Sequence, residues 1–223
     1  MRLDGKVVLI AGASGALGQS VTPTVAQVGA VVVAVDRHPT PSVHHQIVVS
    51  ADATDEAAVT RLVEEVNRKT GPIDVLMNLI GGFAMGQVSE TDTVLWHRMF
   101  AMNATPAFVL SKAALPHMLE RRTGRIIHVA ARVAVEPFPG AAAYIAAKAA
   151  LVAFIRALSL EIAGSGVTVN GVLPATMDTA ANRKAMPDAD TSKWVKPASI
   201  AELLILLAAE EARHINGTLI SIG

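Results

Sequence analysis

The chain has 223 residues, and an α/β domain of this length buries roughly 70 to 75% of the surface of its unfolded chain, so one core needs no disulfides. The 19 basic and 19 acidic residues balance, so no net charge attracts nucleic acid or an anionic membrane. The absence of cysteine excludes disulfides, thiolate metal sites and cysteine nucleophiles, and we expect a cytoplasmic protein.

The beginning of the chain, MRLDGKVVLIAGASG, contains an apolar run that is too short to span a membrane. It also lacks the pattern of a secretory signal. We therefore expect neither a membrane anchor nor a cleaved leader.

Short aliphatic runs alternate with longer amphipathic stretches. The runs predict strands at residues 6–12, 31–37, 46–52, 73–81, 124–131, 167–174 and 217–223. Helices are predicted from about Ala16, from Asp55, between the fourth and fifth strands, around Tyr144 and from Ala198. This alternation is typical of βαβ units, so we predict a single doubly wound Rossmann domain, a seven-stranded parallel α/β sheet with helices on both faces. Pro23 lies too deep in the first helix for an N-terminal proline, which predicts a kink or a shortened helix.

A glycine turn follows the first strand. Glycines at this point allow a tight turn and bring backbone N–H groups and the positive helix end close to a pyrophosphate. Three glycines alone are a weak signal, because ordinary strand-to-helix turns contain them too. The predicted phosphate-binding segment comprises Gly12, Ser14, Gly15, Ala16, Leu17 and Gly18.

The second predicted strand ends in an acidic residue, Asp36, 18 residues after Gly18. A carboxylate at this place accepts hydrogen bonds from the adenine ribose and repels a 2′-phosphate. This favours NAD(H) as the cofactor. NADP(H) is the alternative, because the neighbouring Arg37 is able to pair with a phosphate. A second alternative is that Asp36 only ends the strand in a surface turn, where aspartate is common.

Tyr144 and Lys148 lie four residues apart in a predicted helix, so their side chains share one face. An ammonium beside a phenol lowers the phenol pKa from its usual value near 10, which favours acid or base chemistry at neutral pH. The same spacing recurs by chance on many helices. The pair therefore gains meaning only from its surroundings.

Taken together, these motifs resemble the short-chain dehydrogenase/reductase family from Gly5 to Gly223. Further matches are Asp52 in ADATD, Asn78 to Gly81, Asn103, NGVLP from Asn170 to Pro174 and the final NGTLISIG. The resemblance implies an NAD(P)-dependent oxidoreductase that acts on a small molecule. The balanced charge predicts no nucleic-acid or membrane partner.

The resemblance also implies roles for the matched residues. Tyr144 would donate or accept the proton, Lys148 would bind the nicotinamide ribose and tune Tyr144, and Asn103 would hold a water in the proton relay. Asp52 would contact adenine, and the backbone after Pro174 with Thr179 would fix the carboxamide. The other residues expected at the cofactor are Ala51, Ala53, Asn78, Leu79, Ile80, Gly81, Thr176 and Met177.

Three positions depart from the family pattern. The glycine spacing is GxxGxxG in place of GxxxGxG, and Leu79 stands where most members have a second asparagine. Ala131, 13 residues before Tyr144, stands where the family has its catalytic serine. Removing one oxyanion donor costs roughly 10²- to 10³-fold in rate. The alanine therefore favours a substrate that develops no alkoxide. The alternatives are a carbonyl reductase or alcohol dehydrogenase that works without the serine, and a non-catalytic dinucleotide-binding sensor.

Residues 175–197 show no clear periodicity and follow a predicted strand end. Long loops at the carboxyl ends of such strands are typically lids, so we predict a substrate lid. Its strings VLPATMDT and NRKAMPDAD, together with IGGFA from Ile80 to Ala84, are similar to segments of dihydropteridine reductases, which lack the serine and reduce a quinonoid dihydropterin. The resemblance implies such a conjugated substrate. We expect it to contact Phe83, Ala131, Met186 and Trp194.

The seven histidines are scattered, His44 and His45 in a predicted surface loop included, and no spacing predicts a metal site. The Ala-rich helix at 105–119 and the helix around Tyr144 carry apolar residues on more than one face, and a helix on a sheet needs only one apolar stripe. The surplus predicts a subunit interface. The family resemblance points to the same helices, so we expect a homodimer or homotetramer.

Overall fold

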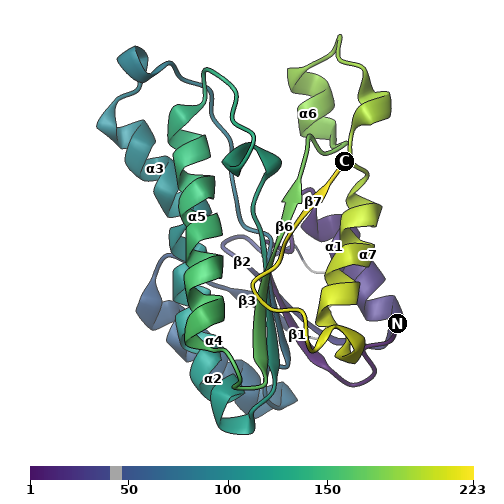
Figure 1. Cartoon of the computed structure of the whole chain (residues 1–223). Helices are drawn as coiled ribbons and strands as arrows, with labels where there is room; N and C mark the ends of the chain where they lie inside the picture. Colours follow the sequence, from purple (N-terminus) through teal and green to yellow (C-terminus); the bar gives the residue numbers. More distant parts are fainter. Residues whose placement is uncertain (41–46) are drawn as a thin grey trace.

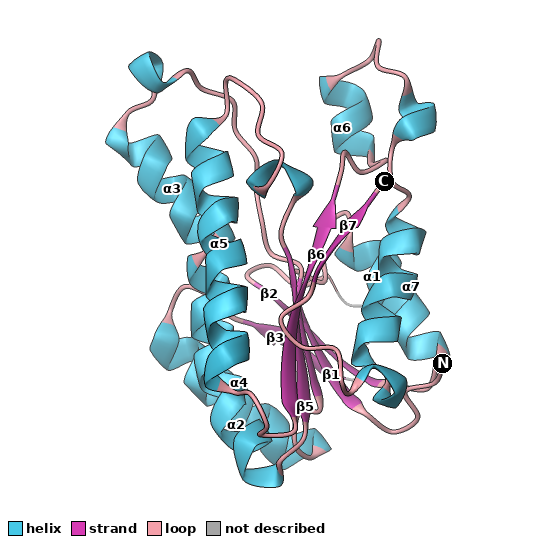
Figure 2. Cartoon of the chain, viewed as in Figure 1, coloured by secondary structure: helices cyan, strands magenta, loops and turns pink. Residues whose placement is uncertain are grey.

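The computed structural model describes residues 1–40 and 47–223, and these form one parallel sheet between two layers of helices (Figure 1; Figure 2). The sheet has seven strands in the order β3-β2-β1-β4-β5-β6-β7, and every neighbouring pair is parallel. The strands are β1 (Val7–Ala11), β2 (Val31–Asp36), β3 (Ile47–Ser50), β4 (Val75–Asn78), β5 (Gly124–Val129), β6 (Val167–Pro174) and β7 (Leu219–Ile222). The predicted doubly wound α/β fold is confirmed.

Helices cover both faces of the sheet (Figure 2). One face carries α2 (Glu56–Thr70), α4 (Thr105–Arg121) and α5 (Ala142–Glu161), and α3 (Thr93–Asn103) packs on α5. The other face carries α1 (Gly18–Gln27) and α7 (Pro197–Ala208), which contact each other. The remaining helical elements of the described residues are the short α6 (Ala180–Ala185) and 3-10 turns at Val88–Glu90, Arg132–Ala134, Thr191–Lys193 and Glu210–Ala212.

Strand β1 shows why the strands read as unbroken aliphatic runs. Val7, Leu9 and Ala11 pack in the apolar layer toward α2, α4 and α5. Val8 and Ile10 pack in the layer toward α1 and α7. Successive side chains of a strand point to opposite faces, and both faces of this sheet are covered by helices. Every residue of β1 is therefore buried.

The boundaries differ from the sequence-based expectations in particular places. Helix α1 begins at Gly18 and continues past Pro23 to Gln27, so the proline does not end the helix. The fully buried Val21 and Val25 on either side of the proline hold the helix against the sheet. The long helical region before β5 is two helices that separate at Ala104. His44 and His45 lie outside the described residues.

Helix α5 is long and apolar enough to cross a membrane by length and composition alone. Core helices pass the same test, because burial in a protein also selects apolar residues. In this structure α5 packs against α3 and β6, and its buried residues include Lys148. Its apolar character thus fits a packed helix of this fold.

A buried polar network joins the carboxyl ends of β4 and β5 to α4. The amide Nδ2 of Asn78 lies 3.3 Å from Nδ1 of His128, and Nε2 of His128 lies 3.1 Å from Oγ of Ser111. Because an amide NH₂ group only donates, Nδ1 accepts, and Nε2 therefore carries the hydrogen toward Ser111. The other end of the Asn78 amide accepts the N–H of Ile80 at 3.1 Å. The network fixes the chain where it leaves β4.

Burial, with a smaller contribution from Lys148, lowers the pKa of His128 to about 3. In the unfolded chain the imidazole takes a proton near pH 6.5, so acid below that pH favours unfolding until the folded state also protonates. We predict that, as the pH is lowered from about 6 to about 4, His128 decreases the free energy of unfolding by about 1.4 kcal/mol for each pH unit. Urea unfolding of the wild type and His128→Gln across this range measures the difference in slope. The exposed His214→Gln serves as the control, and equal slopes for the wild type and His128→Gln would contradict the prediction.

Candidate active site

The predicted site residues gather where the carboxyl ends of the parallel strands meet. The strands end at Ala11, Asp36, Asn78, Val129 and Pro174, and the β6 arrow in Figure 1 points toward this edge of the sheet. Because all strands run in one direction, segments far apart in the sequence meet there. This edge is the candidate active site.

The glycine turn after β1 packs directly on the end of β4. Gly12 has φ +84°, and a Cβ added there would lie 3.1 Å from the backbone nitrogen of Ile80. A Cβ on Gly18 would collide with the carbonyls of Gly12 and Ala13. Glycine at these two positions is thus required by close backbone approach.

The start of α1 provides an anion cradle. No side chain caps this helix, and in residues 1–40 and 47–223 the N–H groups of Ala16, Leu17 and Gly18 have no hydrogen-bond acceptor. Unpaired N–H groups at a helix N-terminus bind phosphate. The residues present therefore fit a dinucleotide pyrophosphate.

The ends of β2 and β3 lie beside this cradle. Asp36 Oδ2 accepts the N–H of Ser14 at 3.2 Å, and the N–H of Ala51 donates to the Asp36 carbonyl at 3.0 Å. The hydroxyl of Ser14 accepts the N–H of Thr40, while Arg37 is exposed. Within the described part of the chain Asp36 Oδ1 has no donor, so one carboxylate oxygen is available to a ribose hydroxyl.

Asp52 stabilises its own turn. Its Oδ1 accepts the hydroxyl and the N–H of Thr54 at 2.7 and 2.8 Å, and these hydrogen bonds lower the Asp52 pKa. The next side chain, Ala53, is buried in the core. Asp52 itself is exposed beside the end of β3, as a residue in contact with adenine would be.

Tyr144 and Lys148 lie in the first two turns of α5. The phenol ring packs in a cluster with Met99 and Ala147, and Phe83 meets it edge to face, with 5.0 Å between ring centroids and 88° between planes. The Lys148 ammonium is buried and donates to the carbonyl of Val129 at 3.0 Å. The helix thus brings both groups to the edge where β5 ends.

The expected lowering of the Tyr144 pKa by Lys148 is wrong for this structure. Burial raises the Tyr144 pKa to about 12, and burial lowers the Lys148 pKa to about 8. The ammonium is engaged by the Val129 carbonyl at the strand end, so desolvation dominates at the phenol. The phenol therefore keeps its proton at neutral pH.

Asn103, the last residue of α3, holds the loop that follows β4. Its Oδ1 accepts the N–H of Gly82 at 3.1 Å, and its Nδ2 donates to the carbonyls of Gly82 and Met99 at 2.9 Å. A Cβ on Gly81 would lie 3.0 Å from both Asn103 Oδ1 and Lys148 Nζ. Asn103 and Lys148 therefore meet at the same glycine.

The side-chain amide of Asn103 has both hydrogens engaged, so its main-chain carbonyl is the better group for a bound water. In the described residues that carbonyl accepts no hydrogen bond. The carbonyl is without a donor because the helix breaks between α3 and α4, where the N–H of Ala107 donates to the carbonyl of Ala104 instead. The water-holding role remains a prediction.

Ala131 is buried two residues after the end of β5, where it precedes the 3-10 turn Arg132–Ala134. Its methyl group offers no hydrogen bond to a substrate oxygen. Sequence reasoning did not single out Arg132, whose Nε is buried and has no partner within the described ranges. The available signal was a cation one residue after the missing serine.

Residues 175–197 contain more regular structure than their sequence pattern indicated. At the base of the segment Val195 donates to Thr176 and accepts from Asp178, each at 2.8 Å. Thr179 Oγ1 accepts the N–H of Asn182 and thereby caps α6. The Thr179 cap and the backbone hydrogen bonds of Val195 explain why a short helix forms here without apolar periodicity.

The expected substrate residues differ in their surroundings. Phe83 contacts Tyr144. Trp194 is half-buried after the 3-10 turn at Thr191–Lys193 and, among the aromatic residues the structure describes, contacts none. Met186 is exposed at the end of α6.

The expected cofactor residues near the ends of β4 and β6 lie in different surroundings. Leu79 and Met177 pack in the apolar layer toward α1 and α7, and Ile80 packs in the opposite layer. Pro174 is buried at the end of β6, and Thr176 is exposed.

The sequence matches a family model and is similar to known proteins. Residues 6–190 match the family model for short chain dehydrogenase. The chain is 32% identical to meso-2,3-butanediol dehydrogenase of Serratia marcescens, over 97% of this chain and 92% of that protein. It is 34% identical to "inactive 2-(S)-hydroxypropyl-CoM dehydrogenase 2" of Xanthobacter autotrophicus, over 78% and 82%.

The fold is shared with a solved structure of similar size. The aldohexose dehydrogenase of Thermoplasma acidophilum superposes with a TM-score of 0.91 at 25% identity, covering 98% of this chain and 92% of that one. The chain belongs to the short-chain dehydrogenase family and is an NAD(P)-dependent oxidoreductase.

Proposed function

We propose that this enzyme reduces a quinonoid dihydropteridine, or a similar planar conjugated substrate, with NADH. The observation that carries the proposal is Ala131, a buried methyl group with no hydroxyl at the position of the family's serine, two residues after the Val129 carbonyl that accepts a hydrogen bond from the Lys148 ammonium. Burial raises the pKa of Tyr144, one turn before Lys148 on α5, to about 12, so the phenol is protonated at neutral pH. Such a site supplies a proton but lacks one donor for an alkoxide. A conjugated imine gains its proton without forming an alkoxide and so needs no serine.

The chemistry of the chain's own residues follows from their protonation states. When bound, the nicotinamide supplies a hydride. The substrate gains that hydride and one proton, and the proton comes from Tyr144 Oη, which water reprotonates afterwards. Phe83 is 56% exposed and packs edge to face with the phenol, so its exposed surface suits the stacking of a flat heterocycle. Lys148, mostly protonated below its pKa of about 8, would donate to the nicotinamide ribose.

We predict that Tyr144→Phe lowers turnover with quinonoid dihydropterin by about 10²- to 10⁴-fold, because general acid catalysis contributes that much. The dissociation constant of NADH should stay within about twofold, since the dinucleotide cradle lies at the start of α1. Stopped-flow NADH oxidation measures the first quantity and fluorescence titration the second. Full activity of the variant would remove Tyr144 as the acid.

NAD(H) is the preferred cofactor in this proposal, with NADP(H) as the alternative. The support is Asp36 at the end of β2, one carboxylate oxygen of which has no donor among residues 1–40 and 47–223. We predict that Asp36→Ser lowers the ratio of kcat/KM for NADH to that for NADPH by about tenfold or more, because it removes the repulsion of a 2′-phosphate. Arg37→Met is the matched control and should change the ratio in the opposite direction. An unchanged ratio in Asp36→Ser would contradict this assignment.

The second candidate function is a carbonyl reductase or alcohol dehydrogenase that acts without the serine. The names of two similar proteins, meso-2,3-butanediol dehydrogenase and aldohexose dehydrogenase, favour it. We predict that Ala131→Ser leaves pterin reduction within about twofold and raises ketone reduction by up to roughly 10²-fold, the rate contribution of one oxyanion donor. Assays of the wild type and Ala131→Ser with both substrate classes test this. A wild type that already prefers ketones would favour the second candidate.

A non-catalytic sensor is the alternative from another class, and the similar protein described as inactive gives it weight. Such a sensor would bind the dinucleotide but would not catalyse hydride transfer. Tight NADH binding without oxidation across pterins, quinones and ketones would support the sensor. The retention of Tyr144, Lys148 and Asn103 at one strand edge supports catalysis.

The assembly is part of the same proposal. We infer that residues 1–223 form a single domain in which 175–197 is a substrate lid, supported by its paired base at Val195. The outer faces of α4 and α5 carry the exposed apolar residues Phe108 and Leu160, and burying them against a second copy would remove that area from water. This supports a homodimer or homotetramer. A cytoplasmic location fits the absence of cysteine.

A further inference from the structure

Residues 82–87, which follow β4, pair with the segment that leads into α5. The N–H of Gly86 donates to the carbonyl of Gly140 at 2.8 Å, and Gly86 forms a parallel bridge with Ala141. Exposure alternates along this stretch as in an extended strand, whose successive side chains point to opposite sides. The partly buried positions are Gly82, Ala84 and Gly86, and the exposed positions are Phe83, Met85 and Gln87.

The partly buried side of this segment is filled by α3 and by the turn before it. A Cβ on Gly82 would collide with Met102, and a Cβ on Gly86 would lie 2.7 Å from Thr91 Oγ1. Ala84 packs against the cluster that contains Met99. A shift of the segment by one residue would turn the large side chains into this filled side. The pairing therefore fixes Phe83 and Met85 on the exposed side.

The exposed side of the segment lies against the beginning of the catalytic helix. Phe83 packs edge to face with Tyr144, and Met85 Cε lies 3.1 Å from the place of a Cβ on Gly140. Gly140 has φ +90° and no side chain that would cover the methionine. Met85 is 58% exposed, about as much as Phe83. Two residues of extended chain span roughly 7 Å, so the apolar surface continues outward from the phenol by about the length of a phenyl group.

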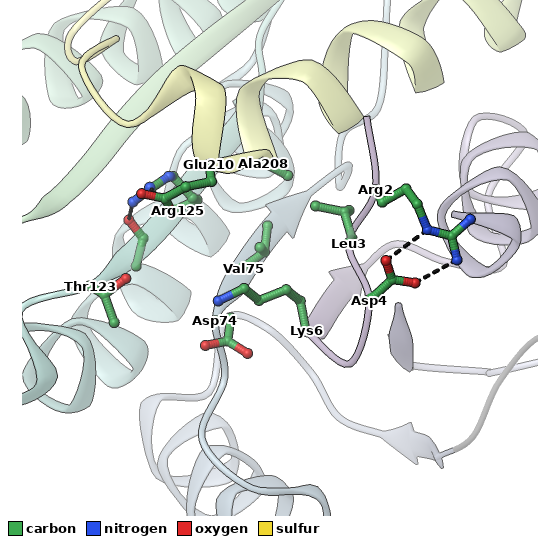
Figure 3. A pocket seen from close by; sticks show the side chains of 11 residues that line it. Arg2, Leu3, Asp4, Lys6, Asp74, Val75, Thr123, Arg125, Ala208 and Glu210 are labelled. Carbon is green, nitrogen blue, oxygen red and sulfur yellow. Dashed lines mark hydrogen bonds and ion pairs between the residues drawn. The ribbon is translucent and has the colours of Figure 1, made fainter. Parts of the chain in front are cut away.

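The hollow of about 240 Å³ in Figure 3 is at the opposite edge of the sheet. Lys6 precedes β1 and Asp74 precedes β4, so strand starts frame this hollow, whereas the catalytic helix begins near the strand ends. Ion pairs line it, Arg2 with Asp4 and Arg125 with Glu210. The apolar surface beside Tyr144 is therefore the one that a substrate reaches while its ring reacts.

We propose that the substrate carries an apolar substituent of about phenyl size on its reacting ring, and that this substituent lies on Phe83 and Met85. The inference rests on the proposed function and specifies its substrate class. Exposed apolar side chains that gather beside a reactive group mark a ligand surface, and a methionine thioether adapts to aromatic and aliphatic groups alike. Gln87 begins a polar surface next along the segment and so limits the length of the substituent. A hydroxylated substituent would lose hydration on Met85 without gaining a hydrogen bond.

Calorimetric titration of the NAD⁺-saturated protein with two oxidised pterins tests the proposal. One pterin carries a phenyl group at C6 and the other a dihydroxypropyl group at C6. NAD⁺ has no hydride to give, so the titration measures binding alone. We expect the wild type to bind the phenyl compound about tenfold more tightly, the effect of removing about 55 Å² of apolar surface from water.

Three variants assign this preference to Met85. Met85→Ser should reduce it to about twofold, and Met85→Leu, which keeps the apolar area, should retain it. Val94→Ser is the matched control, because Val94 is 72% exposed on α3 and lies outside the segment, and it should retain the tenfold preference. Sedimentation of the same variants shows whether a second copy of the chain covers Met85 instead.

Equal affinity of the wild type for the two pterins, an unchanged preference in Met85→Ser, or binding of neither pterin would overturn the proposal. A change of oligomeric state in Met85→Ser with an unchanged preference would overturn it too and would assign the surface to a second copy. The phenyl preference without NADH oxidation by any quinonoid dihydropterin would support this inference while the proposed function fails. Turnover of both quinonoid compounds with equal affinity for the two pterins would do the reverse.

Discussion

The close backbone approach at the end of β4 is the constraint on which the site depends. Gly12 packs against Ile80 on one side, and Gly81 lies against Asn103 and Lys148 on the other. One short segment therefore sets the distance between the dinucleotide turn and the catalytic helix. The Asn78 amide, fixed by His128, sets the direction in which that segment leaves the sheet.

Burial shifts the pKa values of the two proposed catalytic groups in opposite directions, and both shifts favour the neutral forms. The phenol of Tyr144 becomes a weaker acid, while the ammonium of Lys148 releases its proton more readily. At neutral pH the phenol holds its proton and most of the ammonium keeps its charge. This resting state is the correct starting point for a reduction, in which the site must deliver a proton.

Much of the fold was predictable, because strands buried on both faces and glycines in tight turns leave strong local patterns. The positions of Tyr144 and Lys148 on one helix and of Asp36 at a strand end were predictable for the same reason, since helix spacing and strand ends are read directly from the chain. The pairing of Lys148 with Val129 and of Asn103 with Gly82 was not, because these contacts join segments far apart in the sequence. The continuation of α1 past Pro23 likewise depends on packing against α7.

His128 and Lys148 share the same low-dielectric environment, and of these two bases only Lys148 carries a charge. The positive charge of Lys148 further lowers the pKa of His128, so a second cation beside the first is excluded. The fixed tautomer of His128 instead supplies one acceptor to Asn78 and one donor to Ser111. A neutral imidazole thus keeps the strand ends rigid without competing with Lys148 for a proton. The Lys148 ammonium stays charged, as its proposed role at the cofactor ribose requires.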